Sequence, residues 1–155
     1  MKSNKTYSLE SRWHIAADRA SVWNAVSDAA AWGAWWPALL QARELEAGDA
    51  EGRGAYWRFT WRSRLLYRLQ FGVRITRLDH LRRMEGSIDG DLAGAGAWTF
   101  DEARGVCTVT HSWQVRLNKG WMRALDPLAR PVFEWNHHAV MRQGERGLNV
   151  YVSRV

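Results

Sequence analysis

His111 is the residue in this sequence best suited to proton transfer. It falls on the apolar side of an alternating segment, 107–117, together with Cys107, Val109, Trp113 and Val115. A neutral imidazole on an apolar strand face can act as an acid or a base near neutral pH if burial tunes its pKa. Such a histidine more often takes a hydrogen-bonded place in a core. Both interpretations of His111 stay open at this stage.

Two amides form the second group of interest, because they fall within an apolar stripe. Stepping at about 100° per residue along a predicted helix, Asn136 and Gln143 lie near the middle of one side. The apolar residues of that side are Val132, Phe133, Trp135, Ala139 and Val140. A buried amide must find a hydrogen-bond partner or lose free energy on desolvation. We therefore expect these amides to contact the sheet, water or a bound molecule.

Other kinds of site find little support in the sequence. His137 and His138 are adjacent and diverge on a helix, and no His-x3-His or cysteine pair is present, so we expect no metal site. Asp89, Asp91 and Asp101 fall at strand ends or turns, which leaves a catalytic carboxylate pair unsupported. No glycine-rich loop follows a strand and opens a helix, which argues against nucleotides. No cofactor is expected.

The elements that must position these residues are one long helix and several short strands. The helix is expected from Asn118 to Leu148, with Pro131 in a first turn and no breaking residue from Val132 to Gln143. Residues 149–155 either extend this helix or form a loose end, as residues 1–6 also could. Alternation predicts strands at 7–15, 39–47, 56–62, 67–76, 83–89, 98–100 and 107–117, of which 39–47 is a charged edge strand.

Two short helices are expected between the first two strands. Asp18 can cap the first, which ends near Ser27, and the second stops before Pro37. The second carries the tryptophans Trp32, Trp35 and Trp36. This cluster could plug one end of a core or line an entrance.

The alternating strands separate an aromatic face from an arginine face. Trp57, Phe59 and Trp61 alternate with polar residues, and the aromatic face as a whole contains Trp57, Phe59, Trp61, Tyr67, Phe71, Trp98 and Trp113. The arginine face contains Arg58, Arg62, Arg68 and Arg74. The aromatic side chains, facing the helix, form either a close-packed core or the wall of a small-molecule pocket.

Composition is that of one soluble domain spanning residues 1–155. One cysteine, Cys107, excludes an internal disulfide, and no signal peptide or membrane span is evident, so we expect a cytoplasmic protein. The chain has 11 tryptophans, far more than core filling normally uses. Its net charge of +6 would favour anionic partners. Nucleic acid is nevertheless disfavoured, because the aromatic residues point away from the arginine face.

Several segments resemble the polyketide cyclase/dehydrase-like branch of the START-like or Bet v 1-like (SRPBCC) superfamily. They are WWP at 35–37, the glycines at 48, 52 and 54, WRSRLLY at 61–67, GDLAGAGAW at 90–98 and PVFEWNHHAVMRQGERGL at 131–148. The resemblance implies an α+β helix-grip fold, in which a curved seven-stranded antiparallel sheet grips a long C-terminal helix around a cavity. It transfers no reaction and no catalytic residue.

We therefore expect the chain to bind a hydrophobic or aromatic small molecule, with transport or sequestration as its role. The candidate ligand-binding residues are Trp57, Phe59, Trp61, Tyr67, Phe71, Trp98, His111, Trp113, Val132, Trp135, Asn136, Ala139 and Gln143. The alternative is a cyclase or dehydratase that uses the same cavity. In that case His111 would be the acid or base, and Asn136 or Tyr67 would polarise a carbonyl.

Overall fold

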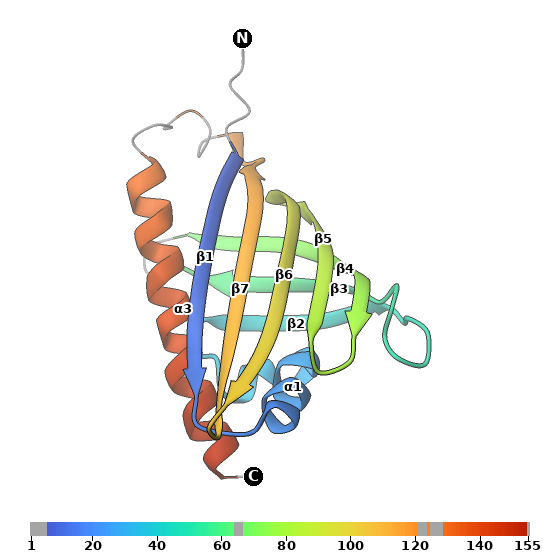
Figure 1. The fold of residues 1–155 in the computed structure, drawn as a ribbon. Coiled ribbons are helices and arrows are strands. Elements are labelled where there is room, and N and C mark those ends of the chain that lie inside the picture. Colours follow the sequence, from blue (N-terminus) through green and yellow to red (C-terminus); the bar gives the residue numbers. More distant parts are fainter. Residues whose placement is uncertain (1–5, 64–66, 121–123, 125–128, 155) are drawn as a thin grey trace.

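A curved antiparallel sheet wraps around one long helix (Figure 1). The computed structural model describes residues 6–63, 67–120, 124 and 129–154. The elements are β1 (Thr6–Ile15), α1 (Arg19–Ser27), the 3-10 helix η1 (Ala29–Ala34), β2 (Leu39–Glu46), β3 (Tyr56–Arg62), β4 (Arg68–Asp79), β5 (Arg83–Gly90), β6 (Leu92–Ala103), β7 (Val106–Leu117) and α3 (Ala129–Ser153). This is the predicted α+β helix-grip fold.

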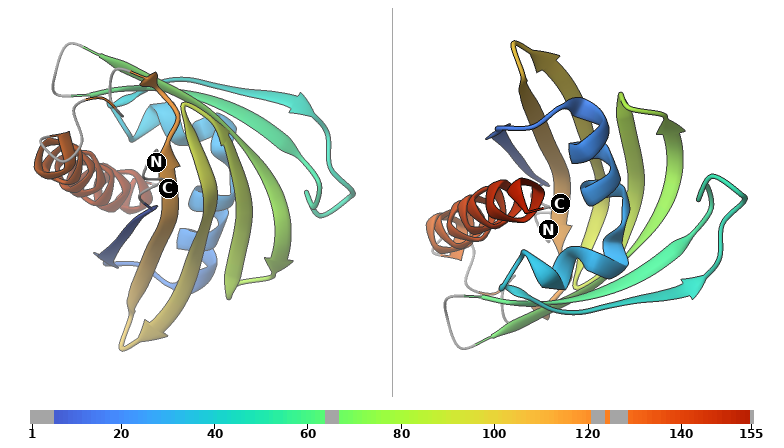
Figure 2. Two further views of the ribbon diagram at one scale, coloured as in Figure 1. Left: turned by 90° about the horizontal axis from the view of Figure 1, so that it is seen from above. Right: turned by 90° about the horizontal axis from the view of Figure 1, so that it is seen from below.

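The strand order is β1-β7-β6-β5-β4-β3-β2, and all neighbours are antiparallel. β1 and β2 are therefore the two edges, which confirms the edge position expected for β2. The sheet bends so that α3 lies on its open, concave side, with α1 and η1 across one end (Figure 2). Helix α3 thus covers the space between the two edges.

Polar side chains of α3 bind the β1 edge of the sheet. The Glu145 carboxylate accepts a hydrogen bond from the His14 amide at 2.8 Å, and the Asn149 side-chain oxygen accepts one from the Ala16 amide at 2.9 Å. Edge amides without a sheet partner are satisfied in this way. The helix is fixed along β1 by hydrogen bonds as well as by packing.

The opposite side of α3 is bound to the segment that leads into β2. The Gln143 side-chain oxygen accepts a hydrogen bond from the Ala38 amide at 2.8 Å, and the Trp36 indole nitrogen donates to the Val140 carbonyl at 2.9 Å. Gln143 therefore has the sheet-side partner that a buried amide requires. Its visible role is to hold the helix across the sheet opening.

The first short helix begins as predicted. The Asp18 side chain accepts a hydrogen bond from the Ser21 amide at 2.7 Å, and this bond holds the pKa of the Asp18 carboxyl below its usual value. The helix ends at Ser27, and η1 follows with Trp32 on its buried side.

The bounds of the long helix differ from the expectation at both ends. Asn118 and Lys119 are not helical, and part of the predicted first half, 121–123 and 125–128, lies outside the described residues. Pro131 lies in the first turn of α3, as its fixed φ and missing N–H favour. At the other end, residues 149–153 continue the helix, so they are not a loose end.

Two glycines let α3 approach the tryptophan segment closely. A Cβ atom on Gly144 would lie 2.6 Å from Trp36 and 2.8 Å from Trp13. A Cβ on Gly147 would fall against the backbone carbonyl of Trp35, which cannot move aside as a side chain can. These glycines supply no apolar area, but they set the distance between the helix and η1.

Gly147→Ala is expected to lower the free energy of unfolding by about 1–3 kcal/mol, the usual cost of overpacking, even though alanine favours a helix by about 1 kcal/mol. Urea unfolding measures the change. Gly33→Ala is the matched control, because nothing lies within 4 Å of a Cβ at Gly33. Equal stability of the two variants would contradict the close approach of α3.

Candidate functional site

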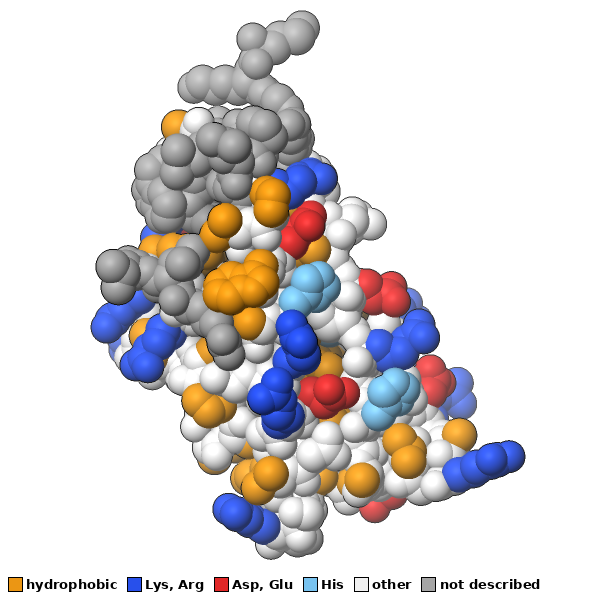
Figure 3. All heavy atoms as spheres, turned by 90° about the vertical axis from the view of Figure 1, so that its left-hand side faces the viewer, with side chains coloured by type: hydrophobic (Ala, Val, Ile, Leu, Met, Phe, Trp, Pro, Cys, Tyr) orange, Lys and Arg blue, Asp and Glu red, His pale blue; other side chains and the backbone are white. Residues whose placement is uncertain are grey.

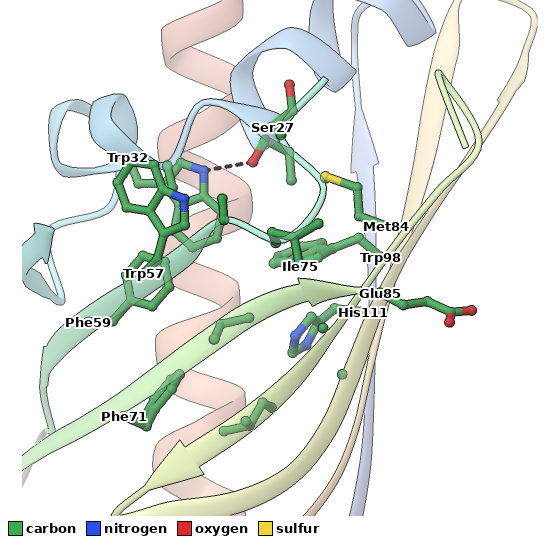
Figure 4. A pocket seen from close by; sticks show the side chains of 18 of the residues that line it. Ser27, Trp32, Trp57, Phe59, Phe71, Ile75, Met84, Glu85, Trp98 and His111 are labelled. Carbon is green, nitrogen blue, oxygen red and sulfur yellow. Dashed lines mark hydrogen bonds between the residues drawn. The ribbon is translucent and has the colours of Figure 1, made fainter. Parts of the chain in front are cut away.

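A cavity of about 870 Å³ lies between the concave face of the sheet and α3. Its walls are dominated by aromatic side chains, which are Trp23, Trp32, Trp36, Trp57, Phe59, Trp61, Phe71, Trp98, Trp113 and Phe133. Figure 4 shows Trp57, Phe59, Phe71 and His111 around a common space, with Glu85 pointing away from it. The sequence allowed either a close-packed core or a pocket between the sheet and the helix. The structure contains a pocket.

Strand register explains the aromatic wall. Phe59 of β3 lies opposite Phe71 of β4, and Trp61 lies opposite Leu69, so these side chains share one face of the sheet. The rings of Phe59 and Phe71 are 6.2 Å apart. The predicted aromatic face, apart from Tyr67, thus lines the cavity.

The tryptophan cluster fills one end of the core, the first of the two roles that the sequence left open. Trp36 is 2% exposed and packs against the rings of Trp13 and Trp61 at 5.3 and 4.7 Å. Trp32 stacks on Phe59 at 5.3 Å, with an angle of 11° between the rings. Trp35 is buried away from the cavity, whereas Trp32 and Trp36 each also present a surface to it. The cluster fills one end of the interior and forms part of the cavity wall.

His111 projects from β7 into this aromatic surrounding. It is 6% exposed, and its ring lies 4.3 Å from Trp98 and 5.5 Å from Trp113. Its Nδ1 atom is buried without a hydrogen-bond partner. Burial, with a smaller effect of His137, holds the pKa of His111 well below its usual value, so the imidazole is neutral at pH 7.

His137, which was not among the predicted ligand-binding residues, also reaches the cavity. It is 6% exposed, and its ring lies 6.2 Å from that of His111 and 4.9 Å from Trp113. Its Nε2 atom is buried without a hydrogen-bond partner. Burial, followed by the nearby His138, lowers the pKa of His137 to about 4. Two neutral imidazoles therefore face the same part of the cavity.

The other predicted helical residues divide between the cavity and the surface. Asn136 is buried and lines the cavity. Val132 and Trp135 are 42% and 50% exposed and do not line it, so the expectation that they form part of the wall is wrong. The outer face of α3 carries apolar side chains interspersed with basic and acidic ones (Figure 3).

Three more predicted residues do not line the cavity. Ala139 is half-buried on the side of α3, and Gln143 is engaged with the Ala38 amide. Tyr67 is half-buried against the core, and burial raises the pKa of its phenol. None of the three therefore takes the place in the wall that the sequence predicted.

The inward face of α3 is rotated from the predicted stripe. Its buried residues are Phe133, Asn136, His137, Met141, Gly144 and Leu148. They recur at intervals of three and four, the spacing of a helical face. The predicted stripe shares Phe133 and Asn136 with this face. It omitted His137 and Gly144, which interrupt the apolar pattern, and included the exposed Val132 and Trp135.

The rim of the cavity is formed largely by the loop between β2 and β3, which the sequence treated only as a glycine-framed turn. Exposed residues of this loop, among them Asp49, Glu51 and Arg53, line the opening. The Asp49 side chain accepts hydrogen bonds from the amides of Glu51 and Arg53, which hold the pKa of the Asp49 carboxyl below its usual value. The Arg53 side chain donates to the Leu78 carbonyl at 3.1 Å, which fixes the loop to β4.

Neither a metal cluster nor a membrane-spanning helix is found in the described part of the chain. No three His, Cys, Asp or Glu side chains there are grouped to hold a metal ion. None of the helices there is both long and apolar enough to cross a membrane.

Solved structures with the same fold cover almost the whole chain. A START superfamily protein from Mycobacterium smegmatis matches with a TM-score of 0.76 and 12% identity, over 95% of this chain and 97% of the other. The Zhui aromatase/cyclase from Streptomyces sp. R1128 matches with a TM-score of 0.76 and 15% identity, over 97% and 95%. A protein from Thermus thermophilus matches with a TM-score of 0.75 and 14% identity, over 94% and 99%.

Comparison with curated protein sequences gives no match for this chain. A family model, described as polyketide cyclase / dehydrase and lipid transport, matches residues 6–148. This match covers the sheet and most of α3, and therefore every element that lines the cavity. The chain belongs to the polyketide cyclase/dehydrase and lipid transport family.

Proposed function

We propose that this protein binds a hydrophobic, aromatic small molecule in the cavity between the sheet and α3, and transports or sequesters it. The observation that carries the proposal is the cavity of about 870 Å³ with its wall of indole and phenyl rings. Ligand pockets in proteins occupy roughly 300–1,000 Å³ and are mostly apolar, with a few polar groups that orient the ligand. Asn136, His111 and His137 are such groups.

An enzyme that cyclises or dehydrates a polyketide-like substrate is the second candidate. It is favoured by the buried His111 in the cavity and by the similarity in fold to a protein named as an aromatase/cyclase. The lowered pKa of His111 leaves the imidazole neutral and able to accept a proton, but makes it a weak base. Hydrogen bonding to a ligand needs no such strength, so binding remains the first proposal.

Native mass spectrometry of the purified protein tests the first proposal. We expect a second species, heavier than the chain by the mass of one small molecule, that disappears after extraction with organic solvent. A protein of bare mass that also fails to take up added aromatic compounds would contradict it. Conversion of a bound compound by the wild type but not by His111→Ala would instead favour the enzyme.

Trp113→Ala is expected to weaken binding of an aromatic ligand such as naphthalene by about tenfold, corresponding to about 1.4 kcal/mol. The Trp113 ring lines the cavity and contacts both His111 and His137. Equilibrium dialysis measures the affinity. Trp135→Ala is the matched control, expected to change affinity less than twofold because Trp135 is half exposed outside the cavity. Equal losses in the two variants would contradict this location of the site.

A further inference from the structure

His111 and His137 form a pair of polar groups inside an otherwise aromatic wall. Both side chains line the cavity, and their rings are inclined by 29° with centroids 6.2 Å apart. Each ring has a buried nitrogen without a hydrogen-bond partner, Nδ1 in His111 and Nε2 in His137. Unsatisfied buried polar atoms are rare, and each costs free energy unless water or a ligand completes it.

The charged side chains around the cavity do not turn this pair into an ion-binding site. The carboxylates that line the cavity are Glu44, Asp49, Glu51 and Glu85. The first three are exposed at the rim, and Glu85 points away from the space and pairs with Arg77 and Arg83. The arginines that line the cavity, Arg53 and Arg62, are exposed as well. Among the described residues, no buried charged side chain therefore lines the cavity beside the histidine pair.

We propose that His111 and His137 together bind a hydroxyl group carried by an aromatic or conjugated ring, that is, a phenol or an enol. This inference depends on the proposed function, because it names the chemical class of the ligand that the cavity binds. The ring of the ligand lies against the aromatic wall, and its hydroxyl group lies at the histidine pair.

The donors and acceptors of the two imidazole rings favour a hydroxyl group over other polar groups of a ligand. Each neutral imidazole has one N–H donor and one nitrogen acceptor. A hydroxyl group can donate to the free nitrogen of one ring and accept from the N–H of the other. An ether oxygen can only accept, so it leaves one ring nitrogen unsatisfied. A carboxylate or an ammonium group brings a charge into a site without a counter-ion, which is costly.

Four compounds of similar shape test the selectivity, namely 2-naphthol, 2-methoxynaphthalene, naphthalene and 2-naphthoate. Equilibrium dialysis at pH 7.5 gives the affinity of the protein for each. We expect 2-naphthol to bind about tenfold more tightly than naphthalene or 2-methoxynaphthalene, as one or two hydrogen bonds of about 1 kcal/mol imply. We expect 2-naphthoate to bind more weakly than 2-naphthol.

The histidine variants separate recognition from general binding. In His111→Phe and in His137→Phe, the preference for 2-naphthol over naphthalene should fall to less than about threefold, while naphthalene still binds. His14→Phe is the matched control, since His14 is exposed on β1, and it should keep the preference. If the cavity variants do not fold, the four affinities of the wild-type protein decide the question.

Each outcome has a defined meaning. Equal binding of 2-naphthol, its methyl ether and naphthalene to the wild type would overturn the hydroxyl assignment and leave the proposed function standing. Tightest binding of 2-naphthoate would also overturn it. Failure of all four compounds to bind would count against the proposed function itself.

Discussion

Trp36→Ala is expected to lower the free energy of unfolding by about 3–5 kcal/mol, the usual cost of removing a large buried aromatic side chain. Trp36 is 2% exposed and contacts the rings of Trp13, Trp32 and Trp61. Its indole nitrogen also donates the hydrogen bond to the Val140 carbonyl that holds α3. Typical domains are stable by only about 5–15 kcal/mol, so the loss should shift the melting temperature by roughly 10 °C.

Two further variants define the cause of this loss. Trp36→Phe keeps an aromatic ring and removes the hydrogen bond, so its loss should be smaller than that of Trp36→Ala. Trp135→Ala removes the same side chain from an exposed position on α3 and should cost less than about 1 kcal/mol. Urea unfolding of the three proteins measures the differences. A loss in Trp135→Ala as large as that in Trp36→Ala would contradict the burial of these two residues.

The sheet could be predicted from the sequence because a strand repeats every two residues. That period assigns each side chain to one of two faces, so alternation alone places Phe59, Phe71 and His111 on the same face. The charged composition of β2 also indicated its edge position. The resemblance then supplied what alternation cannot give, the curvature of the sheet and the position of the helix across it.

The inward face of α3 was predicted less accurately than the faces of the sheet. A helix can turn any of several faces inward, and only the hydrophobicity of the side chains was available to select one. Trp135 is large and apolar, yet it is exposed, whereas His137 and Gly144 are buried. Gly144 is buried because only a residue without a side chain permits the close approach to Trp36 and Trp13. His137 is buried because a neutral imidazole tolerates an aromatic surrounding.

The two buried histidines are expected to make the stability of the protein depend on pH. Each has a pKa in the folded state below the value of about 6.5 in an unfolded chain, and that of His137 is lowered to about 4 by burial. Between the lowered pKa of the folded state and the pKa of about 6.5 of the unfolded chain, each histidine binds a proton in the unfolded chain but not in the folded protein. Stability is therefore fully retained above about pH 6.5 and is lost as the pH falls below it.

The expected loss follows from the pKa difference. One pKa unit corresponds to about 1.4 kcal/mol, so the pKa of about 4 of His137 should cost about 2 kcal/mol of stability at pH 5 relative to pH 7.5, and the lowered pKa of His111 adds to this loss. The exposed carboxyls whose pKa values are lowered by hydrogen bonds, Asp18, Glu46 and Asp49, have ordinary values of 3.8–4.5. Their contribution to stability is lost mainly below pH 5, outside this interval.

Urea unfolding of the wild type, His137→Phe and His14→Phe at pH 7.5 and pH 5 measures the effect within each protein. His137→Phe should lose about 2 kcal/mol less than the wild type on acidification, whatever its stability at pH 7.5. His14→Phe is the matched control and should lose as much stability as the wild type, because the His14 side chain is exposed on β1 and lies outside the cavity. An unchanged acid sensitivity in His137→Phe would contradict the lowered pKa that burial gives His137.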